Sequence, residues 1–155
     1  MQKYLDVFIE SIEKKDPSIL PMAHWYLSTE DDRPCAVCHM ATWRLITKVN
    51  YVGVKVFDEE AGSIYAMLNV TESDKPVLLC VRMKVEDEKI SEIELTYFRA
   101  RADSGYWFGV DDMIKYADSW NQEIPEDQRE NREFLQHLGE LVYDNSIEAD
   151  YESDS

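Results

Sequence analysis

Residues 49–101 read VNYVGVKVFDEEAGSIYAMLNVTESDKPVLLCVRMKVEDEKISEIELTYFRAR, and this stretch decides the predicted fold. VNYVGVKVF places Val52, Val54 and Val56 on one face of a strand, and DEEAG makes the turn that follows. Three more strands are predicted in SIYAMLNVTE, VLLCVRMKVE and KISEIELTYFRA, separated by SDKP and by the tight turn Asp87-Glu88. The stretch therefore predicts an antiparallel meander.

Helical patterns lie on both sides of the meander. Leu5, Phe8 and Ile12 fall at helical spacing in QKYLDVFIESIEKK, and IPEDQRENREFLQHLGELVY places Pro125 at a first helical position. HWYLST, between the first helix and the meander, reads as a further strand. The pattern predicts a single α+β domain over residues 1–145, with helices packed on one face of a curved sheet. The acidic end, residues 146–155, has almost no apolar content and is predicted to be a mobile tail.

Charge and composition exclude several classes of function. A net charge of −16 argues against binding to nucleic acid or to an anionic membrane surface, because both need basic side chains. We find neither a membrane-spanning apolar segment nor a signal-peptide pattern. Three cysteines are an odd number, which argues against a full disulfide framework. These features predict a cytoplasmic protein.

The stretch CAVCH, residues 35–39, has the spacing by which c-type haem is attached. The surrounding sequence is strand-rich and carries no export signal, which disfavours haem. A zinc site would need a fourth ligand, and the remaining His24, Cys80 and His137 lack paired spacing. We therefore expect no metal here. Cys35 and Cys38 are interpreted as small, half-buried loop residues, with a redox-sensitive pair as the alternative.

Two carboxylates are the candidates for acid–base chemistry on the sheet. A two-residue turn at 87–88 predicts the cross-strand pairs Val85–Ile90, Met83–Glu92, Arg82–Ile93 and Val81–Glu94. Glu92 and Glu94 would then share an apolar face, where burial would raise the pKa of a carboxyl group. Alternatively, both lie at a solvated end of the sheet. Arg82 is interpreted as an ion-pair partner or as a clamp for an anion or carbonyl.

Aromatic residues suggest a ligand-sized apolar cavity, although core packing explains most of them equally well. They include Trp25, Tyr26, Trp43, Tyr51, Tyr65, Tyr97, Tyr106 and Trp107. An isolated histidine such as His24 is more often structural than catalytic.

The order of elements and several motifs resemble the nuclear transport factor 2-like (SnoaL-like) superfamily, and within it a group of largely unassigned function. The resemblance rests on YLDVFIESIEKKDPSILP, STED, Trp43, FDEEAG and VRMKVEDEKISEIE. It implies a cone-shaped domain with a deep pocket between the curved sheet and the N-terminal helices. Characterised members of the superfamily include ketosteroid isomerase and scytalone dehydratase, and they generally use no cofactor. The loop DRPCAVCHMAT departs from the pattern because it lacks the expected glycine.

Motif matches carry Glu30, Trp43, Asp58, Arg82 and Glu94 over from this resemblance. We expect a cofactor-independent lyase or isomerase of dehydratase or cyclase type, acting on a small apolar biosynthetic intermediate. In this hypothesis Glu30 or Glu94 moves a proton, and Arg82 or Tyr106 stabilises an oxyanion. The predicted pocket residues are Trp43, Asp58, His24, Tyr51 and Trp107. The alternative is a non-catalytic domain that binds a small molecule or a protein. Either function is compatible with a homodimer formed through the exposed sheet face.

Overall fold

The computed structural model describes the backbone of residues 1–99 and 109–152 and the side chains up to residue 143 of these ranges. The chain divides into two compact units, Met1–Asn121 and Gln122–Ser155, where the sequence predicted one domain over residues 1–145. Within the described residues, no helix combines the length and the apolar character that crossing a membrane requires.

The first unit is built on a six-stranded sheet with the order β2-β1-β6-β5-β4-β3. The predicted meander is confirmed, because β3 to β6 pair in sequence as antiparallel neighbours. β1 pairs with β6 in parallel, so the sheet is mixed. The strands are β1 (Met22–Glu30), β2 (Arg33–Pro34), β3 (Ile46–Asp58), β4 (Ser63–Glu72), β5 (Lys75–Glu86) and β6 (Lys89–Phe98).

Three of the hairpins turn without glycine. The β1–β2 turn at Asp31 and Asp32, the β4–β5 turn at Ser73 and Asp74 and the β5–β6 turn at Asp87 and Glu88 each place both central residues at positive φ. Two consecutive positive φ angles define the type I′ turn, whose twist matches that of the flanking strands. The predicted tight turn at 87–88 is confirmed.

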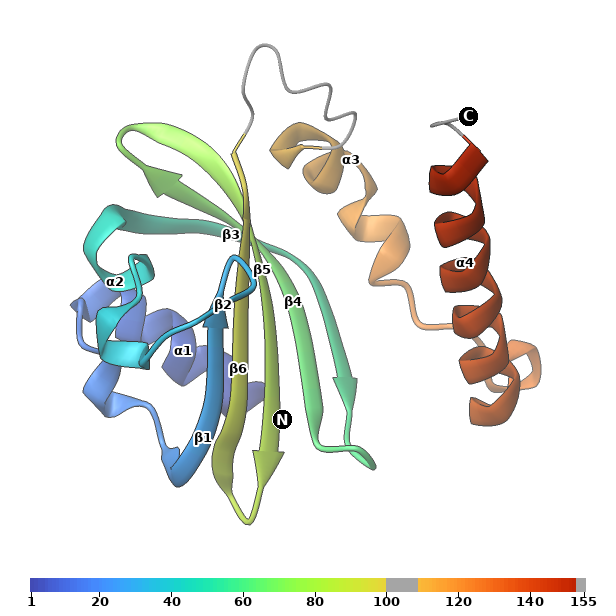
Figure 1. Cartoon of the computed structure of the whole chain (residues 1–155), viewed down its shortest axis with the longest axis horizontal. Helices are drawn as coiled ribbons and strands as arrows, with labels where there is room; N and C mark the ends of the chain where they lie inside the picture. Colours follow the sequence, from blue (N-terminus) through green and yellow to red (C-terminus); the bar gives the residue numbers. More distant parts are fainter. Residues whose placement is uncertain (100–108, 153–155) are drawn as a thin grey trace. The chain divides into compact units, whose positions relative to one another are not determined.

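Helices cover one face of the sheet, which we call the inner face. They are α1 (Gln2–Lys14) and α2 (Thr42–Leu45), with short 3-10 turns η1 (Pro17–Ile19) and η2 (Val37–His39) beside them. Figure 1 shows α1 and α2 together on this side of the curved sheet. Leu5 and Phe8 of α1 are fully buried in one hydrophobic cluster with Leu68, Leu79 and Leu95 from the sheet. The inner face is therefore the main core, and the NTF2-like cone that the resemblance implied is confirmed.

The opposite, outer face carries α3 (Val110–Trp120) at one end of the sheet. Met113 of α3 is fully buried, and a Cβ at Gly53 of β3 would overlap its side chain. Asn121 follows α3 and satisfies the edge of β3, since its amide donates to the Gly53 carbonyl (2.5 Å) and accepts from the Lys55 N–H (3.4 Å). A side chain thus takes the place of a further strand and protects this edge from pairing.

Extra residues in β6 and β3 decide which side chains face outward. Ser91 lies between Ile90, which pairs with Val85, and Glu92, which pairs with Lys84. Beyond this bulge Met83 pairs with Ile93, so the predicted pairing of Met83 with Glu92 is wrong by one residue. Because strand side chains alternate between faces, the shift moves Glu92 and Glu94 to the outer face.

Gly53 lies at one of three register shifts in β3. Val52 pairs with Leu68 of the inner face, whereas Val54 pairs with Met67 of the outer face. The prediction that Val52, Val54 and Val56 share one face is therefore wrong, because the bulge turns Val52 inward while Val54 and Val56 face outward.

The second unit contains η3 (Glu126–Gln128) and α4 (Arg132–Glu152). The Asn131 side chain caps α4 by accepting from the Phe134 N–H (2.8 Å). The sequence suggested that Pro125 is the first residue of the long helix. In the structure Pro125 instead precedes η3. α4 continues through residues 146–152, which the sequence predicted as part of a mobile acidic tail.

Candidate functional site

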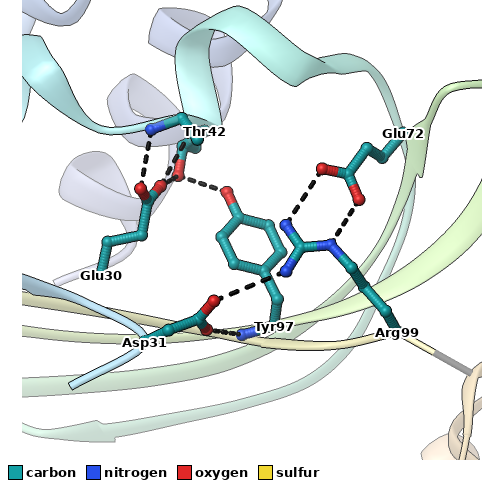
Figure 2. Close-up of polar contacts among 7 residues, drawn as sticks. Glu30, Asp31, Thr42, Glu72, Tyr97 and Arg99 are labelled. Carbon is teal, nitrogen blue, oxygen red and sulfur yellow. Dashed lines mark hydrogen bonds and ion pairs between the residues drawn. The ribbon is translucent and has the colours of Figure 1, made fainter. Parts of the chain in front are cut away.

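A polar network links residues at the ends of β1, β4 and β6 to the start of α2 (Figure 2). Arg99 donates to both oxygens of Glu72, through Nε at 2.5 Å and Nη2 at 3.0 Å, and also pairs with Asp31. Its guanidinium lies over the Tyr97 ring, 4.3 Å from the ring centre. Burial raises the pKa of Tyr97 well above its usual range, so the phenol stays neutral. Sequence analysis did not identify Glu72 or Arg99, whose pairing depends on contacts distant in the sequence.

Glu30, a predicted catalytic base, belongs to this network. One carboxylate oxygen accepts from the Ala41 N–H (2.7 Å), and the other accepts from the Thr42 N–H (2.9 Å) and hydroxyl (2.7 Å). These are backbone donors at the start of α2, which have no partner within the helix. The Thr42 hydroxyl in turn contacts the Tyr97 hydroxyl. The geometry gives Glu30 a capping role, with both oxygens engaged.

Four further residues carried over or placed in the pocket, Trp43, Asp58, Tyr51 and His24, do not come together. Trp43 is buried in the core, edge-on to Phe8, and donates from Nε1 to the Ser11 hydroxyl (3.0 Å). Asp58 accepts from the Ala61 N–H at the β3–β4 turn. Tyr51 is 40% exposed on β3, and His24 is exposed beside Trp25. Tyr106 and Trp107 lie outside the described residues.

In the CAVCH stretch, residues 37–39 form η2, and Cys35 and Ala36 directly precede it. Cys35 is half-buried, whereas Cys38 is exposed, and both are free thiols. The Cys35 carbonyl accepts a hydrogen bond from the Ser28 hydroxyl, which fixes the loop against β1. In the part of the chain that the structure describes, no group of three or more His, Cys, Asp or Glu side chains is arranged to hold a metal ion.

A groove of about 320 Å³ crosses the outer face between β3 and β6. It follows two neighbouring rows of cross-strand partners, each with one residue from β3, β4, β5 and β6 in turn. One row is Val54, Met67, Cys80 and Thr96, and the other is Val56, Tyr65, Arg82 and Glu94. The β3 end of the groove is therefore apolar, and the β6 end is polar.

Arg82 and Glu94, two of the predicted site residues, meet at the polar end. Nη1 of Arg82, on β5, donates to Glu94 (2.9 Å) and to Glu92 (2.6 Å), which both lie on β6. Partial burial lowers the pKa of Arg82, but these carboxylates outweigh the burial and hold the pKa above its usual value. Lys84 lies 3.8 Å from Glu92, so two cations and two carboxylates alternate here. The prediction that Glu94 lies among apolar side chains is wrong, because Glu94 is ion-paired to Arg82 and is about half exposed.

Cys80 lies at the middle of the groove. Burial raises the pKa of its thiol to about 11. The thiol is therefore neutral near pH 7 and acts as a small apolar lining group, because the reactive form of cysteine is the thiolate.

Similarity to known proteins is confined to structure. No family model and no curated protein matches the sequence. An NTF2-like protein of unknown function from Cytophaga hutchinsonii has a TM-score of 0.50 at 7% identity, over 63% of this chain and 88% of that chain. A steroid delta-isomerase from Pseudomonas aeruginosa has a TM-score of 0.50 at 12% identity, over 76% and 88%. A designed protein with a curved β-sheet has a TM-score of 0.52 at 15% identity, over 63% and 84%.

The chain thus has the NTF2-like fold, in agreement with the resemblance drawn from its sequence. Structures with this fold include enzymes and proteins of unknown function. Because fold alone does not fix activity, the function has to be argued from the groove and its residues.

Proposed function

We propose that this protein is a non-catalytic binding domain that holds a small apolar molecule in the groove of the outer sheet face. The observation that carries the proposal is the groove itself, about 320 Å³ in volume, with β3 and β4 contributing apolar side chains to one end. This volume is near the lower limit of typical small-molecule sites, which are mostly apolar with a few oriented polar groups.

The state of the carboxylates supports binding over acid–base catalysis. A general base must reach the substrate proton and exchange protons near the working pH. Glu30 has both oxygens engaged by α2, and Glu94 is held by the Arg82 guanidinium. Cys80, the remaining ionisable group at the centre of the groove, is a neutral thiol.

A groove-filling substitution tests the proposal. We would titrate the full chain with methyl naphthoate, a neutral aromatic ester, by isothermal calorimetry. Cys80→Phe places an aromatic ring at the middle of the groove. Phenylalanine is a residue type that strands accommodate well. Leu27→Phe is the matched control, because Leu27 is 72% exposed and does not line the groove. The proposal predicts that Cys80→Phe loses binding and Leu27→Phe retains it. Equal binding by both variants, or none by the unmodified protein, would refute it.

The isomerase hypothesis retains one supporting observation, since the Glu94 carboxylate borders the groove and is about half exposed. An acid–base site would speed exchange of the methyl protons next to the carbonyl of acetylnaphthalene for deuterium. NMR in heavy water measures this exchange. A binding domain should give the same rate with and without Glu94→Gln. A rate that falls about 100-fold in this variant would favour the enzyme.

A homodimer through the outer face remains a prediction and would cover the same groove. Sedimentation at several protein concentrations, with and without methyl naphthoate, separates the two occupants. A ligand that occupies the groove should shift the protein toward a monomer if such a dimer forms.

A further inference from the structure

Arg82 has hydrogen-bond donors left over at the polar end of the groove. Both carboxylates are bound through the single nitrogen Nη1. Among the residues that the structure describes, Nε and Nη2 donate to no protein acceptor. Guanidinium N–H groups lie in a fixed planar fork, so this pair of donors keeps a defined direction. The fork is therefore ready to receive an acceptor from outside the protein.

The charges around Arg82 select the kind of acceptor. Glu92 and Glu94 already place two negative charges on this guanidinium, and Lys84 balances only one of them. A ligand carboxylate would add a third negative charge at the same position, on a chain whose net charge is −16. A neutral acceptor has no such repulsion, because the guanidinium needs no further counter-charge.

We infer that the groove is selective for apolar molecules that end in a neutral carbonyl acceptor, such as an ester or amide, and that Arg82 Nε and Nη2 determine this selectivity. The ligand's apolar body lies toward Val56 and Tyr65, whose ring offers a surface for stacking. The Thr96 hydroxyl lies in the adjacent row and supplies a further donor at the same end. This inference rests on the proposed binding function and names the class of ligand.

Three probes with one skeleton test the selectivity. Methyl naphthoate carries a neutral acceptor, naphthoate carries an anion, and propylnaphthalene carries no acceptor. Without a polar contact the hydrocarbon would bind best, because burying an unpaired carbonyl costs free energy. We expect the ester to bind at least about tenfold more tightly than either other probe, the lower range for a hydrogen bond to a charged group.

Variants of Arg82 assign the effect to the fork. Arg82→Met should abolish the preference for the ester over propylnaphthalene. Arg82→Lys keeps the positive charge for Glu92 and Glu94 but lacks the fork, so it should fold and still lose the preference. Lys84→Met is the matched control, since Lys84 is ion-paired to Glu92 and lies outside the groove. This control should retain the preference.

The outcomes separate the inference from the function on which it rests. Equal affinity for the ester and the hydrocarbon would overturn the role of Arg82 but leave the groove as a binding site. If naphthoate binds most tightly, the inferred preference for a neutral acceptor is wrong, and the groove instead prefers an anion. If none of the three probes binds, the proposed function fails together with the inference.

Discussion

Arg82 and Glu94 are direct partners across β5 and β6, with Nη1 of the arginine 2.9 Å from the carboxylate. The bulge at Ser91 creates this pairing, because without it Arg82 would face Ile93. The pair occupies the polar end of the outer groove, which makes Glu94 a counter-ion on an open face. In the proposed function, this pairing is a reason to favour ligand binding over proton transfer.

Replacing Glu94 by Gln should change stability little. The side chain is about half exposed, and exposed ion pairs typically contribute less than about 1 kcal/mol. Glutamine also retains an oxygen that can accept from Arg82. We expect the free energy of unfolding in urea to fall by about 0.5 kcal/mol or less. A loss of several kcal/mol would mean that the pair supports the sheet.

Replacing Glu30 by Ala should destabilise the protein by about 2 kcal/mol, the upper range for removing a helix-capping side chain. The change leaves the backbone N–H groups of Ala41 and Thr42 without their acceptor. Glu59→Ala is the control, since Glu59 is an exposed residue near the β3–β4 turn. Urea denaturation of both variants measures the difference. Equal stability of the two would contradict the capping role.

Gly62→Ala should destabilise the first unit by about 1–2 kcal/mol, the cost of a left-handed conformation for a residue with a Cβ atom. Gly62 has φ +67°, and its carbonyl oxygen accepts a hydrogen bond from the Val85 N–H (2.8 Å). A Cβ there would also strike the Val85 carbonyl oxygen.

Gly139→Ala provides a comparison of opposite sign. Gly139 lies in α4, and a Cβ at this position meets no atom within 4 Å. Alanine should therefore stabilise α4 by up to about 1 kcal/mol through its higher helix propensity. Circular dichroism during thermal unfolding measures both variants, and the same sign for both would contradict this account.

The fold was predictable to the extent that it depends on local pattern. The strands β3 to β6 and the turn at 87–88 follow from alternation and turn chemistry, and α1 follows from helical spacing. The parallel pairing of β1 with β6 could not be predicted in this way, because it joins segments about 65 residues apart.

The candidate site was predictable only in its residue types. Arg82 and Glu94 were identified from the sequence, but their common face depends on one extra residue, Ser91, which carries no local bulge signal. Gly53 did carry such a signal, since an isolated glycine within a strand pattern suggests a bulge. With that signal, Val54 and Val56 could have been separated from Val52. Met67 and Cys80 belong to the groove only through the resulting register.

Stability should fall at alkaline pH, in part through Cys80. An unfolded cysteine ionises with a pKa of about 8.5, whereas burial raises the pKa of folded Cys80 to about 11. Between these values the folded state holds a proton that the unfolded state has lost, so the free energy of unfolding falls as pH rises. Cys80→Ala should show a shallower fall in urea titrations across this range. Identical pH dependence would mean that the Cys80 thiol is not buried.

The most direct test of the central claim is NMR of the methionine methyl groups during titration with methyl naphthoate. Met67 lines the outer groove, whereas Met40 and Met83 are buried in the core on the inner side of the sheet. Binding in the outer groove predicts that the Met67 signal shifts with the ligand while those of Met40 and Met83 stay in place. Shifts of Met40 and Met83 without a shift of Met67 would place the ligand on the inner face and contradict the account.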